Sequence, residues 1–240
     1  MAALTEAALL GTWEAALGLG AVRRALTLAV AGGAEPATVA DLAVGHRDGF
    51  LLALRENWFG PGWSGLVTCP ACAEELELEL SDEDVRAVPP AGASAMVAAG
   101  GYEVEFRPVT SRDLLAIRRE APDARRRLLE RCVVAARSEG REVPAPELPD
   151  AVLAALPDAL STEDPQADVR LGLDCAACGH HWAAPFDIGA YLWTELDVYA
   201  RRLLHEVHAL ALGYGWSESE VLAVSPVRRR YYLELAGSVG

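Results

Sequence analysis

Two pairs of cysteines share the spacing that metal sites use. Cys69 and Cys72 form one Cys-x-x-Cys pair, and Cys175 and Cys178 form the other. Two intervening residues allow a tight turn to aim both sulfurs at one cation, with backbone N–H groups supporting the thiolates. Two such turns, or knuckles, facing each other make the closed tetrahedral site of a zinc ribbon. We therefore predict that these four cysteines bind one structural Zn²⁺.

Alternative readings of the cysteines are four unligated thiols or a dithiol redox pair. A redox Cys-x-x-Cys is expected where a strand runs into the helix of a βαβ unit, whereas strand-like alternation flanks both pairs here. A left-handed residue usually follows the second cysteine of a knuckle. Gly179 suits that position, and Ala73 departs from the pattern. A site with four thiolates leaves no position for water, so we expect it to stabilise the fold and to catalyse nothing.

Several other residues are of types that could have a functional role. His180 and His181 follow the second knuckle, and either could replace a cysteine ligand or remain exposed beside the site. His205 and His208 are three residues apart rather than the four of a zincin helix, so we expect no catalytic metal there. Cys132 is expected to be a buried small hydrophobe. Two arginine runs, 125–127 and 228–230, are read as solvated faces, with docking to an acidic partner as the alternative.

Periodicity predicts the elements that position these residues. Alternation over 66–72 and 76–80 predicts two strands around the first knuckle, with leucines inward and Glu75, Glu77 and Glu79 outward. Residues 169–174 alternate into the second knuckle, and a strand is again expected on each side of the cysteine pair. Apolar residues at spacings of three and four predict a helix of about 25 residues beginning after Asp187. Trp182 and Trp193 are expected to cover the metal site and to pack that helix.

Weaker signals predict further elements. Helices are expected at 5–13, 48–58, 111–117 and 122–133, a strand at 101–107, and a short helix within 148–160. Residues 217–220 match a capping box, and Ser225 with Pro226 predicts the start of a final helix.

These elements together predict a mainly helical α+β fold. Its small zinc-ribbon-like β unit is formed by two sequence-distant knuckles, with an inserted helical segment and a C-terminal helical arm. The predicted parts are an N-terminal helical segment, 1–62, a ribbon unit, 63–186, with an inserted strand and helix subdomain at about 85–168, and the arm, 187–240. The separation of about 100 residues between the knuckles requires the two ends of the insert to lie close together.

Composition narrows the class of protein. The 240 residues carry 35 acidic and 21 basic side chains, a net charge of −14, and every basic residue is Arg. This charge argues against broad contact with nucleic acid or with an anionic membrane. Glu6 and Glu14 precede the first basic residue, so we expect no signal peptide, and no apolar run is long enough to span a membrane. A reducing cytoplasm is the expected compartment, where paired cysteines favour metal over disulfide.

The order of several motifs along most of the chain resembles a known family. They lie at 45–59, 69–72, 106–114, 178–188, 205–216 and 225–230. The ensemble resembles the T-even-type phage baseplate proteins, in the version encoded in contractile injection system and phage-tail-like gene clusters of bacteria. The resemblance implies a non-enzymatic role in building a contractile tail, at the baseplate hub or as an assembly factor. Residues 216–235 also look like the ends of some tail assembly chaperones.

The expected function is therefore that of a structural or assembly protein with a structural zinc. Its expected partners are other tail or baseplate proteins, with no nucleic acid, membrane or small-molecule substrate. A zinc-ribbon adaptor in another cytoplasmic assembly, such as transcription or translation, is the first alternative. A dithiol redox enzyme or a metal hydrolase is the second.

Overall fold

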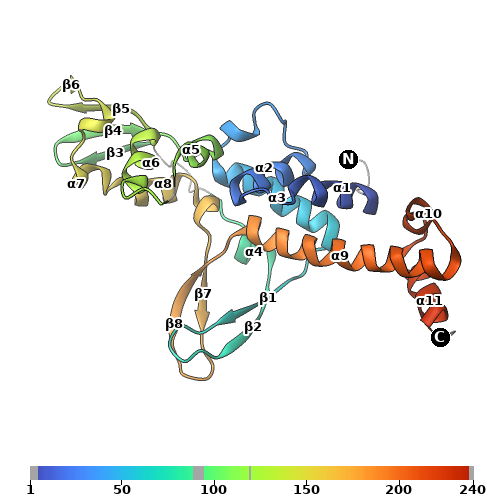
Figure 1. Cartoon of the computed structure of the whole chain (residues 1–240). Coiled ribbons are helices and arrows are strands. Elements are labelled where there is room, and N and C mark those ends of the chain that lie inside the picture. The colour runs from blue at the N-terminus through green and yellow to red at the C-terminus, as the bar shows by residue number, and fades with distance from the viewer. Residues whose placement is uncertain (1–4, 89–94, 119, 238–240) are drawn as a thin grey trace. The chain divides into compact units, whose positions relative to one another are not determined.

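The computed structural model describes residues 5–88, 95–118 and 120–237 (Figure 1). The protein is a mainly helical α+β chain, as the sequence predicts, and the described residues form three small antiparallel sheets. Contacts divide the chain into two compact units, residues 20–189 and residues 1–19 with 190–240. The boundaries of these units differ from those of our predicted segments, because the first helix belongs to the same unit as the C-terminal arm and not to that of the other N-terminal helices. The extreme ends of those segments, 1–4 and 238–240, lie outside the described residues.

The unit of residues 20–189 begins with α2 (Ala21–Ala31), the short helix η1 (Val39–Asp41) and α3 (Val44–Phe59). The helix that we predict from residue 48 starts at Val44 instead. Tertiary contact sets this start, because the Val44 N–H donates to the Val109 carbonyl at 2.9 Å. The helix ends at Phe59, and the next residue, Gly60, has a φ of 86° in the left-handed region, which is typical of a helix C-cap.

Two hairpins carry the cysteine pairs in their turns. One joins β1 (Trp63–Thr68) to β2 (Glu75–Leu80), and the other joins β7 (Arg170–Asp174) to β8 (His181–Pro185). The leucines of β2 are half-buried while its three glutamates are exposed, which confirms the predicted alternation.

Between the hairpins lies an inserted subdomain that is not purely helical. Its four-stranded antiparallel sheet has the order β3 (Met96–Ala99), β4 (Tyr102–Phe106), β5 (Val133–Ser138) and β6 (Arg141–Glu142). The predicted helix over 122–133 is too long, because α6 (Ala124–Cys132) ends where Val133 pairs with Phe106 of β4. The other helices of this region are α4 (Asp82–Val85), α5 (Ser111–Ala116), η2 (Ala145–Glu147), α7 (Asp150–Leu153), α8 (Leu156–Glu163) and η3 (Pro165–Asp168).

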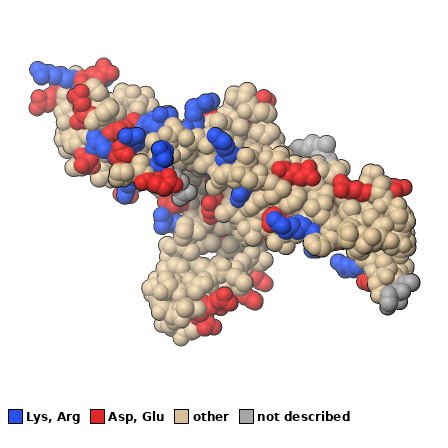
Figure 2. Space-filling view, in the orientation of Figure 1, with Lys and Arg blue, Asp and Glu red and all other residues tan. Residues whose placement is uncertain are grey.

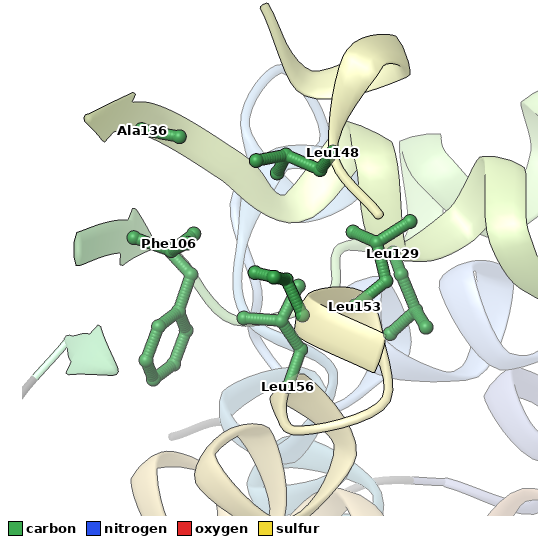
Figure 3. Close-up of a cluster of buried hydrophobic side chains, with 8 residues drawn as sticks. Phe106, Leu129, Ala136, Leu148, Leu153 and Leu156 are labelled. Atoms are coloured by element: carbon green, nitrogen blue, oxygen red, sulfur yellow. The ribbon is translucent and has the colours of Figure 1, made fainter. Parts of the chain in front are cut away.

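The insert has an apolar core of its own. The sheet contributes Phe106 and Ala136, and the segments that follow it contribute Leu148, Leu153 and Leu156 (Figure 3). These side chains are at most 2% exposed. Burial of this size stabilises the insert as a packed body rather than as a loose loop.

Hydrogen bonds tie the two ends of the insert together. The side-chain amide of Gln166 accepts from the Ala87 N–H at 2.8 Å and donates to the Val85 carbonyl at 3.1 Å. Nearby, the Gly45 N–H donates to Asp164 Oδ2 at 2.9 Å. The chain therefore leaves β2 and returns to β7 at the same place, which is what a single site built from two distant knuckles requires.

The second unit combines α1 (Glu6–Ala16) with α9 (Ile188–Tyr214), α10 (Glu218–Ala223) and α11 (Pro226–Gly237). The predicted capping box at Ser217 and Glu220 is present. Arg229 is only 1% exposed and donates to Glu6 and to Glu206, so the solvated face that we predict for its arginine run is wrong at this position. Tertiary packing buries this side chain, because its ion pairs join α11 to α1 and α9.

Candidate metal centre

The two cysteine turns have the same backbone geometry. In the first, the Cys69 N–H donates to the Glu74 carbonyl at 2.8 Å, and the Ala73 N–H donates to the Cys69 carbonyl at 2.9 Å. In the second, Cys175 and Gly179 take the same roles, at 2.9 and 2.8 Å. Ala73 and Gly179 follow the second cysteine of each turn and have φ values of 61° and 71°. Ala73 therefore adopts the left-handed conformation of a knuckle without being glycine.

The four predicted sulfurs lie within 4.8 Å of one another. The sulfur of Cys69 is 3.8 Å from that of Cys178, and the sulfur of Cys72 is 3.6 Å from that of Cys175. A zinc ion bound tetrahedrally at about 2.3 Å would separate its sulfur ligands by about 3.8 Å. The four residues therefore fit one tetrahedral metal ion with little movement. The distances are far too long for disulfides, which join sulfurs at about 2.05 Å.

The charges of the cysteine set favour a bound cation. Although burial raises it, backbone hydrogen bonds from Cys72 and Ala71 bring the pKa of Cys69 down to about 7. Although a backbone hydrogen bond from Glu74 lowers it, the neighbouring sulfurs raise the pKa of Cys72 to about 12. Four negative charges this close repel one another strongly, so only a cation between them allows all four thiolates to form together.

Aromatic contacts join the two hairpins at the ends away from the cysteines. Trp63, at the start of β1, meets Phe186, just after β8, edge to face with 6.0 Å between ring centroids. The guanidinium of Arg55 on α3 lies 4.3 Å from the centre of the Trp63 ring. The ribbon is thus held by packing at its base, and the cysteines are brought together at its tip.

The histidines near the site have contacts of their own. His180 stacks on Trp182, with ring centroids 5.8 Å apart, and His181 Nδ1 hydrogen-bonds to Asp174. Within the described residues, the four cysteines are the only group of three or more metal-binding side chains close enough to share an ion. His205 Nδ1 lies 2.7 Å from the Arg201 carbonyl, within its own helix. Cys132 is fully buried, as predicted.

Sequence reasoning missed a group of buried charges between α3 and the insert. Arg47 and Asp48 are 7% and 8% exposed and pair at 2.6 Å, while Arg47 also donates to Ser111 at 2.9 Å. Burial raises the pKa of Asp48 to about 6, in spite of Arg47. In the sequence, the only sign of this pair was that the two residues are adjacent and oppositely charged. The pattern of apolar residues in α3 does not predict that a charged side chain is buried.

A second missed group surrounds Asp113 at the start of α5. Arg107 and Arg131 both donate to this carboxylate, at 2.6 and 2.9 Å. Although burial opposes it, hydrogen bonds from Arg107 and from Thr110 hold the pKa of Asp113 well below its usual range. The Thr-x-x-Asp capping box was the signal that could have identified it.

No protein-family model, curated protein or solved structure matches this chain. Across residues 5–88, 95–118 and 120–237, no helix combines the length and the apolar character needed to cross a bilayer.

Proposed function

We propose that this chain is a non-enzymatic structural or assembly protein of a contractile phage-tail-like particle, in which Cys69, Cys72, Cys175 and Cys178 hold a structural Zn²⁺. The convergence of four sulfurs from two distant hairpins supports the metal-site part of this proposal. An ion with four thiolate ligands has no free position for substrate or water. Its role is then to stabilise the ribbon, and apparent binding energies of such sites are of order 10 kcal/mol.

The choice of zinc rests on the donor set. Four thiolates in a tetrahedral arrangement suit Zn²⁺ or an iron site, whereas Mg²⁺ and Ca²⁺ prefer oxygen ligands. The hairpin turns place each cysteine pair between two strands, not at the strand-to-helix junction that is typical of thioredoxin-like redox motifs. This placement favours a structural ion over dithiol chemistry.

The tail assignment rests on the order of the motifs described above. In the structure, two of those motifs meet, because Arg47 of the 45–59 motif donates to Ser111 of the 106–114 motif. The proposed partners are other tail or baseplate proteins. The proposed role is that of a hub component or an assembly factor.

A zinc-ribbon adaptor in another cytoplasmic assembly is the alternative. A ribbon that binds nucleic acid would carry a basic face near its knuckles. Here the exposed side chains of β2 are Glu75, Glu77 and Glu79, and Figure 2 shows acidic side chains along the β1–β2 hairpin. This charge favours a protein partner in either reading.

Metal analysis tests the zinc part of the proposal. Native mass spectrometry of the purified chain should show one zinc ion per chain, and Co²⁺ replacement should give the absorption of tetrahedral cobalt–thiolate. Cys72→Ser should lower zinc affinity strongly, whereas Cys132→Ser, matched in chemistry but buried elsewhere, should leave the stoichiometry at one. A zinc-free wild-type chain whose thiols react freely would refute a structural zinc.

Genetics and purification test the tail part. The chain, tagged in its native operon, should co-purify with tail particles or with assembly intermediates, and its deletion should reduce particle yield. Normal particles in the deletion strain, together with absence of the chain from particles and intermediates, would contradict the proposal. Flanking genes for sheath, tube and spike proteins would support it.

A further inference from the structure

A cleft between α9 and α11 lies apart in sequence from the four cysteines. Tyr199, Arg202, Leu203 and Glu206 line it from α9, and Pro226, Arg229, Arg230 and Leu233 line it from α11. Its volume is about 230 Å³. Small-molecule sites usually enclose about 300 Å³ or more, so this cleft suits one or two side chains of a macromolecular partner better than a cofactor.

The charges at this cleft are unbalanced. The buried Arg229 is neutralised by Glu6 at 2.5 Å and by Glu206 at 3.0 Å. The Arg202 side chain is 64% exposed, and its Nε lies 3.8 Å from Glu206, which is a long ion pair. The same carboxylate pairs more closely with Arg229. Arg230 is exposed and makes no ion pair with any residue that the structure describes. Two exposed guanidinium groups therefore border a cleft whose acidic groups are already occupied.

An apolar stripe runs along the exposed side of α11 and adjoins Arg230 at the edge of the cleft, since Val227 lies three residues before Arg230. Val227, Tyr231 and Leu235 are four residues apart, so they lie on one side of the helix, and they are 68%, 64% and 57% exposed. The opposite side of α11, which includes Arg229 and Leu233, packs inward. Exposed apolar residues in a row are typical of a surface that another protein covers.

We propose that the α9–α11 cleft and the α11 stripe together bind an acidic amphipathic helix of a partner protein. The apolar side of that helix would cover Val227, Tyr231 and Leu235, and a carboxylate beside it would pair with Arg230 and Arg202. Arginine forms bidentate pairs with carboxylates, which fixes the register of such a helix. A partner with negative charge is favoured because the exposed charged side chains that line the cleft are those of Arg202 and Arg230.

A second copy of this chain fits the surface less well. The only acidic side chain of α11 is Glu234, against three arginines. Pairing two α11 helices would bring arginines of like charge together, which opposes association. Self-association through α11 is therefore an outcome that would overturn the proposal.

Binding of two synthetic helical peptides tests the inference. One 18-residue probe carries leucines at i, i+3, i+4 and i+7 with glutamates elsewhere, and its control carries lysines in place of the glutamates. Both are labelled with fluorescein and titrated with the intact chain while anisotropy is measured. The acidic probe should bind at least tenfold more tightly than the basic one, and added salt should weaken its binding.

Variants locate the binding surface. The double variant Arg202→Glu with Arg230→Glu should bind the acidic probe at least tenfold more weakly than the wild type. Tyr231→Ala should bind it severalfold more weakly. The control pair Arg23→Glu with Arg118→Glu makes the same charge change in the other unit and should alter binding less than twofold. Circular dichroism and the Tm of each variant show that the fold is retained.

Three results would overturn the inference. The first is equal binding of both probes or no binding of the acidic probe, and the second is binding that the Arg202 and Arg230 reversals leave unchanged. The third is a dimer in sedimentation equilibrium that Tyr231→Ala dissociates. No cysteine lines the cleft, so a negative result in the peptide assay would not contradict the zinc proposal. Likewise, a finding that the chain binds no zinc would not contradict peptide binding at the cleft.

Discussion

Exchanging the residues after the second cysteines of the two knuckles should change zinc affinity in opposite directions. Ala73 and Gly179 both have left-handed φ values, 61° and 71°. The left-handed conformation costs a residue with a side chain about 1–2 kcal/mol relative to glycine. A Cβ at Gly179 would meet no atom within 4 Å, so no steric contact adds to this cost.

The net effect is smaller than the conformational cost. Glycine also loses more backbone entropy on folding, by about 0.4–1 kcal/mol. Ala73→Gly should therefore stabilise the metal-bound knuckle by about 1 kcal/mol, and Gly179→Ala should destabilise its partner by a similar amount. Because 1.4 kcal/mol corresponds to a tenfold change in an equilibrium constant, each change should alter zinc affinity about fivefold.

Competition with a chromophoric zinc chelator at constant pH measures this effect. Ala73→Gly should bind zinc more tightly than the wild type, Gly179→Ala should bind it more weakly, and the double variant should return close to the wild-type affinity. Shifts of the same sign, or shifts below twofold in both single variants, would refute the view that the two knuckles are equivalent and that backbone strain limits one of them.

Three further variants test the buried contacts. Asp48 has a pKa of about 6 in the folded chain against 3.8 as its ordinary value, so ionising it costs stability as pH rises from about 4 to 6. Urea unfolding should show the wild type losing about 2 kcal/mol relative to Asp48→Asn between pH 4 and pH 7, and a constant difference would contradict this burial. Arg229→Met leaves Glu6 without its buried partner and should lower the free energy of unfolding by about 3 kcal/mol or more, read as a fall in Tm; an unchanged Tm would mean that α1 is not held this way. Phe106→Ala, at 1% exposure, should cost about 3–5 kcal/mol and expose the insert to limited proteolysis first, whereas uniform cleavage along the chain would argue against a separate insert core.

Local structure in this chain was largely predictable from sequence. Alternation identified β2 and β7, and spacings of three and four identified α9 nearly to its ends. The capping box at Ser217 was also readable, because it depends only on residues three positions apart. The predicted helix extended too far, to Val133, because the apolar residues there fit a helix and a strand equally well. Pairing with β4 places Val133 in a strand.

The sequence by itself determined which four side chains could hold a metal ion, because residue type and the two-residue spacing define a knuckle without reference to the rest of the chain. Only the tertiary structure decided that the two knuckles share one site. That depends on Gln166 closing the ends of the insert and on Trp63 meeting Phe186 at the base of the hairpins. The burial of Arg229 and Asp48 was likewise invisible, since a charged residue shows its partner only when distant segments pack around it.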